Sequence, residues 1–205
     1  MKSLFGKFLF ALMFLALTQI ASAQSGTAKA IFAGGCYWSM EAVFDPMDGV
    51  LSATSGFAGP EDKQVASSPT GHVEAVEVIY DPTKITYEQL LDAFWKNIDP
   101  TDASGQFCDR GPQYRTAIFY TDNQQKAAAE KSESDVQTHL QKKVATAVLQ
   151  AEKFYPAEAD QQNFTETHKL QYMKYKNGCG RDRRLREVWG TDNKDNKEKE
   201  KGDQR

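Results

Sequence analysis

Short apolar runs with strand character alternate along this chain with segments of helical spacing, and this alternation limits the possible folds most. Residues 72–80 are rich in Val and Ile, which predicts a strand, and Asp81-Pro82 ends it. Thr86 can cap a following helix, in which large apolar residues recur at helical spacing at Leu90, Leu91, Phe94 and Trp95. Such a mixture of strands and helices, with antiparallel pairing available, predicts an α+β fold around one central sheet.

The same criteria place the other elements of this sheet and its helices. We expect further strands at residues 30–33, 50–57, 114–120 and 144–149, and further helices at 38–44, 122–143 and 156–168. Residues 59–71 and 99–112 contain Gly, Pro, Ser and charged side chains, so we expect loops there.

The first 23 residues have the layout of a secretory signal peptide. Two lysines precede ten consecutive apolar residues at 8–17, and Ala21-Ser22-Ala23 forms a small-x-small cleavage signal. A retained membrane anchor is the alternative, but the apolar run is shorter than the roughly 20 residues that span a bilayer. We therefore expect a periplasmic or secreted protein without membrane contact after cleavage, one domain at 24–190, and a disordered, charged tail at 191–205.

Charge and composition exclude several classes of partner. The formal net charge is −3, and removal of the two lysines in the leader would make it −5. A mildly acidic chain without a basic cluster argues against nucleic acid as a partner. The three histidines and the cysteines lack metal-ligand spacing, and no phosphate-binding glycine loop occurs, so we expect neither a metal nor another cofactor.

Three cysteines, Cys36, Cys108 and Cys179, are an odd number for an exported protein. They allow either one static disulfide with a free thiol, or a set that cycles between thiol and disulfide. The composition alone does not choose between these two possibilities.

Residues 34–38, Gly-Gly-Cys-Tyr-Trp, are the most informative motif. Cys36 follows a predicted strand and a Gly-Gly turn and lies at the start of a helix, where unpaired N–H groups favour the thiolate. Tyr37 and Trp38 follow directly and are able to wall a pocket for a small apolar group. The alternative interpretation is a buried structural cysteine with two core aromatic residues.

A carboxyl group lies within the predicted strand at 72–80. Side-chain alternation puts Glu74 on the same face as Val76 and Val78, and a carboxyl among apolar groups has a raised pKa, which suits a proton donor. The opposite face is apolar too, so Glu74 at an exposed strand end is an equal alternative.

Two further segments contain candidate functional groups. Asp109 and Tyr114 lie on a loop that leads into a strand, a common place for functional groups, although a turn role and a core role would also explain them. Cys179 lies between glycines beyond the last predicted element, on a segment that we expect to be mobile. That placement suits a thiol that travels to another sulfur, and a structural disulfide is the alternative.

These segments together resemble the methionine sulfoxide reductase A family. The resemblance rests on residues 35–38, 70–76 and 106–120, on the intervening 80–101, and on Cys-Gly-Arg-Asp at 179–182 with the Leu-Arg-Glu-Val-Trp that follows. It covers roughly residues 30–190. It implies a two-layer α/β sandwich with a central mixed sheet and a ferredoxin-like core, in a single domain.

The resemblance also implies an activity and a role for each site residue. Cys36 would attack the sulfur of methionine-S-sulfoxide, Glu74 would supply a proton, Tyr114 would donate a hydrogen bond, and Asp109 would organise the site. Tyr37, Trp38 and Phe57 would bind the substrate. Cys36 would become a sulfenic acid, which Cys179, or alternatively Cys108, would resolve to a disulfide. Thioredoxin, or an exported thioredoxin-like protein, would reduce this disulfide, and the substrates would be oxidised proteins and peptides.

The chain departs from the family pattern at several positions. Family members usually have Phe at the place of Tyr37 and Tyr at the place of Phe57, so one expected donor to the sulfoxide oxygen is missing, and we hypothesise that Tyr37 or a water replaces it. Ser39 stands where some relatives have a second cysteine, Gln161 stands where His is common, and the loop at 59–69 is short. Two other hypotheses remain open: a cysteine hydrolase with His72 as its base, and a module that binds oxidised methionine without turnover.

Overall fold

The computed structural model describes residues 26–60 and 71–190. The predicted signal peptide, most of the predicted loop at 59–71 and the predicted tail at 191–205 lie outside the described residues. Within the described part, no helix has the length and apolar character that crossing a membrane requires.

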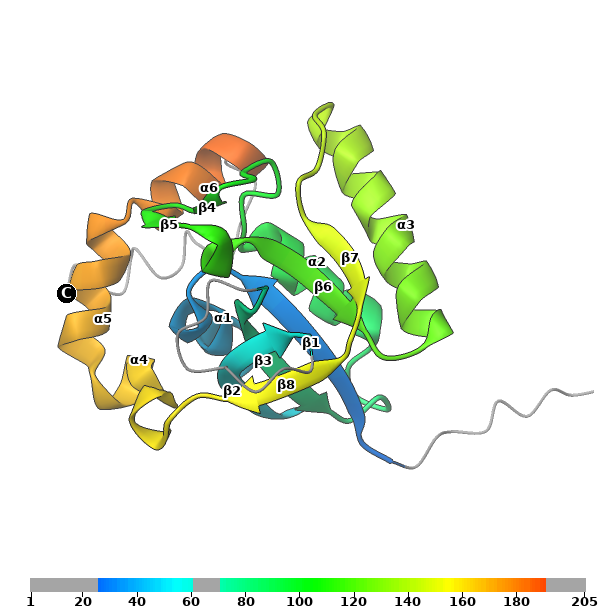
Figure 1. The fold of residues 1–205 in the computed structure, drawn as a ribbon, viewed down its shortest axis with the longest axis horizontal. Coiled ribbons are helices and arrows are strands. Elements are labelled where there is room, and N and C mark those ends of the chain that lie inside the picture. The colour runs from blue at the N-terminus through cyan, green and yellow to red at the C-terminus, as the bar shows by residue number, and fades with distance from the viewer. Residues whose placement is uncertain (1–25, 61–70, 191–205) are drawn as a thin grey trace, which may run out of the picture.

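One curled, six-stranded sheet organises the molecule (Figure 1). Its strand order is β7-β6-β1-β3-β2-β8, with β6 and β7 parallel and the other neighbours antiparallel. The strands are β1 (Ala28–Gly34), β2 (Val50–Gly59), β3 (Val73–Tyr80), β6 (Thr116–Tyr120), β7 (Ala147–Gln150) and β8 (Lys153–Pro156), and β4 (Gly105–Gln106) pairs separately with β5 (Asp109–Arg110). The α-helices are α1 (Tyr37–Phe44), α2 (Tyr87–Lys96), α3 (Asn123–Leu140), α4 (Phe164–Thr167), α5 (Lys169–Gly178) and α6 (Arg181–Trp189).

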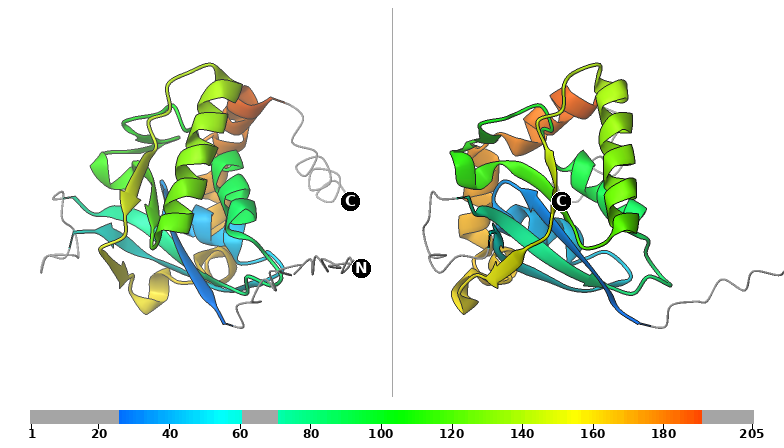
Figure 2. Two further views of the ribbon diagram at one scale, coloured as in Figure 1. Left: turned by 90° about the vertical axis from the view of Figure 1, so that its right-hand side faces the viewer. Right: turned by 45° about the vertical axis from the view of Figure 1, so that its right-hand side comes forward.

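The main core lies between the sheet and the helices α1 and α2, which Figures 1 and 2 show on one side of it. Phe32 of β1 stacks on Phe44, Tyr87 and Phe94, with ring centroids 5.0, 6.0 and 5.3 Å apart. A second, smaller apolar cluster covers the opposite face of the sheet around Ala75, Ala117 and Phe119. The result is a mixed α/β fold in a single domain.

Most of the predicted elements are present. The strands at 30–33, 50–57 and 72–80 correspond to β1, β2 and β3, and the helices at 38–44 and 122–143 correspond to α1 and α3. Thr86 caps α2 through a capping box, in which its hydroxyl accepts from the Gln89 N–H and the Gln89 side chain accepts from the Thr86 N–H. The ferredoxin-like character of the core stays a prediction.

Three predictions about the later part of the chain are wrong. The predicted helix at 156–168 is mostly absent: β8 ends at Pro156, which lacks an N–H, and the helical part shrinks to a 3₁₀ turn and the four residues of α4. The polar loop at 99–112 contains the hairpin of β4 and β5. Cys179 does not follow the last regular element, because it caps α5 and is followed by α6.

The short helices α5 and α6 have few apolar positions, so the hydrophobic periodicity of their sequence is weak. Instead, Arg181 anchors α6: its guanidinium lies 4.5 Å from the Phe107 ring and donates to the Asn97 carbonyl over 2.6 Å. Arg184 pairs with buried Asp99 at 2.7 Å. These polar contacts hold the C-terminal helices against the loops that follow α2.

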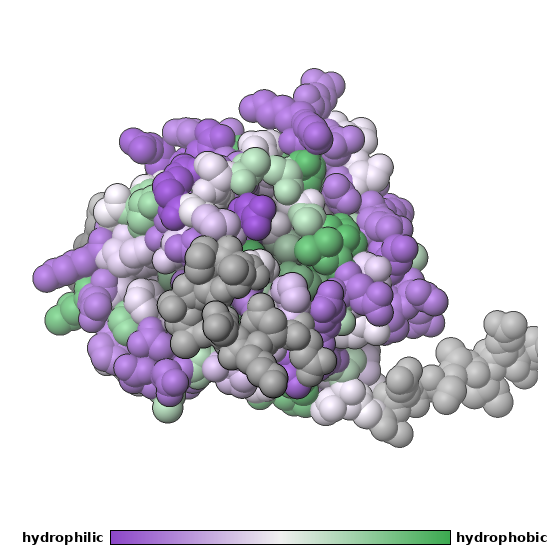
Figure 3. All heavy atoms as spheres, in the orientation of Figure 1, coloured by the Kyte–Doolittle hydropathy of each residue, from purple (hydrophilic) through white to green (hydrophobic). Residues whose placement is uncertain are grey.

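Hydrophilic side chains cover most of the face seen in Figure 3, and hydrophobic ones gather over β6 and β7. Leu149 on β7 is 47% exposed. The strand β7 forms one edge of the sheet, so this apolar area lies at the opposite edge from β8.

Candidate active site

Cys36 lies at the junction between β1 and α1, where it caps the helix. Gly35 precedes it with a φ of +85°, a conformation that favours glycine. The Cys36 carbonyl accepts from the N–H groups of Ser39 and Met40, and the Ser39 N–H also interacts with the thiol. The strand end and the helix start therefore fix both the backbone and the sulfur of Cys36.

Gly35 also allows close packing against the loop that carries the other candidate residues. A Cβ at Gly35 would lie 2.6 Å from the Cβ of Gln106, which is fully buried and hydrogen-bonded to both the N–H and the carbonyl of Asp99. The turn that positions Cys36 and the loop that positions Asp109 thus touch at this glycine.

We expect Gly35→Ala to lower the free energy of unfolding by about 3 kcal/mol, from left-handed backbone strain and overpacking against Gln106. Urea unfolding measures this value. Gly178→Ala is the matched control: nothing lies within 4 Å of the Cβ it adds at the end of α5, so it should be neutral or slightly stabilising. Equal stabilities for the two variants would contradict the contact.

Burial dominates the acidity of the Cys36 thiol. Cys36 is 4% exposed, and burial, together with the nearby Glu74 and Asp109, raises the pKa of the thiol to about 11. The hydrogen bonds from Tyr175 and the Ser39 N–H act in the opposite direction and are the weaker influence. The N–H groups at the helix start therefore favour the thiolate, as expected, but desolvation outweighs them.

Glu74 projects toward Cys36 from β3. Its carboxylate accepts from the Tyr37 N–H over 3.0 Å and hydrogen-bonds with Tyr114. Burial, helped by the Asp109 charge, raises the pKa of Glu74 to about 7, against the hydrogen bonds from Tyr37 and Tyr114. Glu74 is therefore partly protonated near neutral pH.

Asp109 and Tyr114 come from the loop region after α2. Asp109 lies on β5 and accepts a hydrogen bond from the Tyr175 hydroxyl. Tyr114 ends a 3₁₀ turn at Pro112–Tyr114 rather than lying in the predicted strand. Burial raises the pKa of Tyr114, and the charges of Glu74, Asp109 and Cys36 act in the same direction. The structure thus brings all four predicted catalytic residues together.

Aromatic rings form a wall beside Cys36. Tyr37 meets Trp38 and Phe57 with centroids 5.9 and 5.8 Å apart, and Phe57 pairs with Glu74 across β2 and β3. Trp38 stacks face to face on Phe164 of α4 at 3.8 Å. Its buried indole N–H has no hydrogen-bond partner among the described residues. The Tyr37 hydroxyl donates to Gln161 over 3.3 Å.

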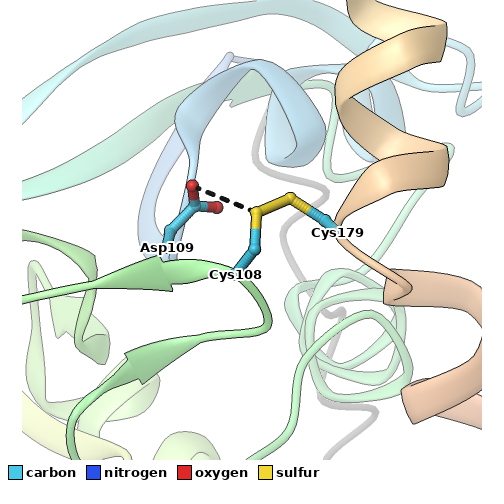
Figure 4. A group of neighbouring side chains, drawn as sticks. All are labelled: Cys108, Asp109 and Cys179. Carbon is cyan, nitrogen blue, oxygen red and sulfur yellow. Dashed lines mark hydrogen bonds between the residues drawn. A yellow bond between two sulfur atoms is a disulfide. The ribbon is translucent and has the colours of Figure 1, made fainter.

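A disulfide joins the two candidate resolving cysteines, Cys108 and Cys179, whose Cα atoms are 4.8 Å apart. Figure 4 shows it between the β4–β5 loop and the end of α5, with the Asp109 carboxylate facing the Cys108 sulfur at 3.8 Å. Cys36 is the free cysteine of this structure. Cys108 is exposed and Cys179 half-buried, whereas Cys36 is buried, so this disulfide is far more accessible to another protein than Cys36 is.

The sequence interpretation missed Tyr175. This residue lies in the middle of α5, reaches both Cys36 and Asp109, and meets Trp38 edge-on. A tyrosine four residues before Cys179 was visible in the sequence, but without a predicted helix there was no reason to direct it toward the site.

The structure does not support His72 as a base for Cys36. Its Nε2 is 3.0 Å from the Pro60 carbonyl oxygen, and its ring packs against Tyr155. Among the described residues, the side chains that influence the Cys36 pKa are Tyr175, Glu74 and Asp109. Within the described part of the chain, the charged groups that act on Cys36 are thus carboxylates, and His72 is not one of them.

Comparisons with known proteins identify relatives. Residues 28–193 match the family model of peptide methionine sulfoxide reductase. Peptide methionine sulfoxide reductase MsrA 2 of Caulobacter vibrioides is 44% identical over 196 residues, which cover 93% of this chain and 100% of that protein. Peptide methionine sulfoxide reductase MsrA of Bacillus licheniformis is 43% identical over 168 residues, which cover 78% and 93%.

Solved structures show the same similarity. Methionine sulfoxide reductase A of Corynebacterium diphtheriae matches with a TM-score of 0.63 at 29% identity, covering 72% of this chain and 77% of that one. Reduced Mxr1 of Saccharomyces cerevisiae matches with a TM-score of 0.65 at 26% identity, covering 71% and 88%. With the family model matching most of its length, the chain belongs to the methionine sulfoxide reductase A family of peptide methionine sulfoxide reductases.

Proposed function

We propose that this enzyme repairs oxidised proteins by reducing methionine-S-sulfoxide, protein-bound and free, through a sulfenic acid on Cys36. The observation that carries this proposal is the juxtaposition of a buried free thiol with a carboxyl group whose pKa lies near 7. A nucleophile and a proton source thus meet at one place, as reduction of a sulfoxide requires.

In the first step, the Cys36 sulfur attacks the sulfoxide sulfur and the S–O bond of the substrate breaks. The oxygen gains negative charge, which Glu74 neutralises with a proton while Tyr114 donates a hydrogen bond. Asp109 holds the Tyr175 hydroxyl, and Tyr37, Trp38 and Phe57 contact the S-methyl group. The oxygen passes to Cys36, so one methionine and one cysteine sulfenic acid form, with no external electron yet consumed.

In the second step, the Cys179 thiol attacks the Cys36 sulfenic acid, which releases water and leaves a Cys36–Cys179 disulfide. Cys108 then displaces Cys36 from this disulfide, which gives the Cys108–Cys179 bond and a free Cys36 thiol. The observed pair of sulfurs supports this order, because it is the state that such a relay would leave. Cys179 is our choice for the first attack because Tyr175, one helical turn earlier in α5, already reaches Cys36.

We propose that a thioredoxin, or a thioredoxin-like protein of the compartment to which the predicted leader directs the chain, reduces the Cys108–Cys179 disulfide. The exposure of Cys108 supports this choice of entry point. Mxr1 of Saccharomyces cerevisiae, whose reduced form resembles this chain, has also been solved in complex with Trx2. A periplasmic or secreted location would require an exported reductant, because the cytosolic thioredoxin pool would be out of reach.

We also propose that the four central strands, in the order β6-β1-β3-β2, form a ferredoxin-like core with α1 and α2. The position of β3 between β1 and β2, antiparallel to both, supports this description. The two helices then cross over on the same side of the sheet.

Mass spectrometry of one turnover tests the proposed function. The reduced enzyme, freed of reductant, is mixed with a peptide containing methionine-S-sulfoxide and sampled over time. We expect the peptide to lose one oxygen, a Cys36–Cys179 disulfide to appear first, and a Cys108–Cys179 disulfide to replace it. A transient Cys36–Cys108 disulfide would reverse the roles of the two resolving thiols. An unchanged peptide with three intact thiols would refute the reductase function.

A further inference from the structure

We propose that Tyr175 is a further catalytic residue, whose hydroxyl connects the Cys36 sulfur to the Asp109 carboxylate and donates a hydrogen bond to the Cys36 thiolate. This inference rests on the proposed function and deepens it. Neither the sequence pattern nor the resemblance assigned a role to this residue.

The Tyr175 hydroxyl joins three elements of the site. It donates to Asp109 Oδ2 on β5 and is hydrogen-bonded to Cys36 at the start of α1, while its own backbone belongs to α5. Its ring meets Trp38 edge-on at 6.0 Å and 89°, which fixes the direction of the hydroxyl. Tyr175 therefore approaches the reacting sulfur from α5.

The chemistry follows from the single proton on this hydroxyl. While Cys36 is a thiol, its S–H donates to the Tyr175 oxygen and the Tyr175 O–H donates to Asp109. When the thiol loses its proton, the Tyr175 O–H turns from Asp109 to the sulfur and donates to the thiolate. Tyr175 stays neutral throughout, and burial with the neighbouring Cys36 and Asp109 charges holds its pKa far above the usual range. The buried thiolate thus gains a hydrogen-bond donor.

The other side chains around Cys36 oppose its ionisation. Glu74 on β3 and Asp109 on β5 both raise the pKa of the thiol. Tyr37 on α1 and Tyr114 in the 3₁₀ turn are close enough for the Cys36 charge to raise their own pKa values. Among the described residues, Tyr175 is the side chain whose hydrogen bond lowers the pKa of Cys36. Its removal should therefore make the nucleophile weaker.

Tyr175 is also tied to the resolving thiol. The Cys179 N–H donates to the Tyr175 carbonyl over 2.9 Å, so both residues move with α5. A displacement of α5 that carries Cys179 about one helical turn toward Cys36 must withdraw the Tyr175 hydroxyl from the sulfur. Tyr175 therefore assists the reduction of the sulfoxide, and its loss should leave disulfide formation unaffected.

Alkylation of the disulfide-bonded enzyme tests the hydrogen bond, because Cys36 is then the free thiol. The rate of iodoacetamide labelling at Cys36 is followed by mass spectrometry across pH. We expect Tyr175→Phe to raise the pH midpoint of labelling by about one unit, the effect of losing one hydrogen bond to a charged group. Circular dichroism at each pH checks that both proteins stay folded, because Cys36 of an unfolded chain would titrate as an ordinary, exposed thiol. Tyr172→Phe is the control, since this tyrosine of α5 contacts Ser39 at 3.3 Å instead.

Single-turnover kinetics of the reduced enzyme test the catalytic role. With a methionine-S-sulfoxide peptide at neutral pH, Tyr175→Phe should form methionine about tenfold more slowly, in proportion to the lost thiolate. The later disulfide steps should keep the wild-type rates, as should every step in Tyr172→Phe. A Tyr175→Phe variant with the wild-type midpoint and the wild-type first step would overturn the proposal. A wild-type enzyme that forms no methionine would instead refute the proposed function.

Discussion

Cys36→Ser should abolish methionine formation even in the first turnover, by about 10⁴-fold or more, because a serine hydroxyl cannot replace the thiolate as nucleophile. Cys108→Ser and Cys179→Ser should each still form one methionine per enzyme molecule. These two variants should then stop, because reducing equivalents no longer reach Cys36. Stopped-flow or quenched-flow measurement of methionine per enzyme, without and with thioredoxin, separates the two kinds of loss.

The trapped intermediates make this series more decisive. Cys179→Ser should accumulate the Cys36 sulfenic acid, which dimedone labels, and Cys108→Ser should accumulate the Cys36–Cys179 disulfide. Urea unfolding of each variant checks that the loss is chemical, since Cys36 is buried and the Cys108–Cys179 bond closes a loop of 71 residues. A Cys36→Ser variant that still formed methionine would remove Cys36 from the reaction and with it the proposed function.

The first half of the fold was predictable because local signals and tertiary packing agree there. The Val-rich run of β3 has apolar residues on both faces, and both faces of the sheet are covered. The spacing of Leu90, Leu91, Phe94 and Trp95 matches the buried face of α2. In both cases the pattern that defines the element is the one that the core uses.

The C-terminal part was not predictable in the same way. The helices α5 and α6 bury few apolar side chains, and Leu170 and Met173 are largely exposed. They are held by the Cys108–Cys179 disulfide and by single polar contacts over long sequence separations, such as Arg181 to Asn97 and Tyr175 to Asp109. Hydrophobic periodicity carries no information about contacts of this kind.

The site shows the same contrast between the predictable first half of the chain and its C-terminal part. The sequence indicated Cys36, Glu74, Asp109 and Tyr114, and the structure brings their side chains together. It did not indicate that burial would raise the Cys36 pKa, because the helix start was visible in the sequence and the covering by α5 was not. The covering helix also brings Tyr175, whose side chain completes the surroundings of the sulfur.

Glu74→Gln should slow the first methionine-forming step by about 10²-fold at pH 7, because an amide has no proton to give to the sulfoxide oxygen. The substitution should also change how the rate of this step depends on pH. In the reacting state Cys36 is ionised and Glu74 is protonated, so the two groups together carry one proton. Since the two groups interact, the profile belongs to the pair rather than to either residue.

The direction in which the wild-type rate changes with pH follows from two pKa values, about 7 for Glu74 and about 11 for Cys36. Below pH 7 both groups are protonated, so the rate of the wild-type enzyme rises about tenfold per pH unit as the thiol ionises. Above pH 7, Glu74 loses its proton as fast as Cys36 gains charge, so the rate becomes level. Glu74→Gln should lack this break and rise steadily from pH 6 to 9. Single-turnover rates across this range measure both profiles.

Stability gives a second readout that does not depend on turnover. Because the folded pKa of Glu74 is raised, the folded state favours the protonated carboxyl, and the wild-type protein should lose stability as pH rises from about 4.5 to about 7. Glu74→Gln is uncharged throughout and should not show this loss, so its unfolding free energy relative to wild type should increase over this interval. Urea titrations at pH 5 and 8 measure the difference. A constant difference, together with a break at pH 7 in the rate profile of Glu74→Gln, would show that another group supplies the proton.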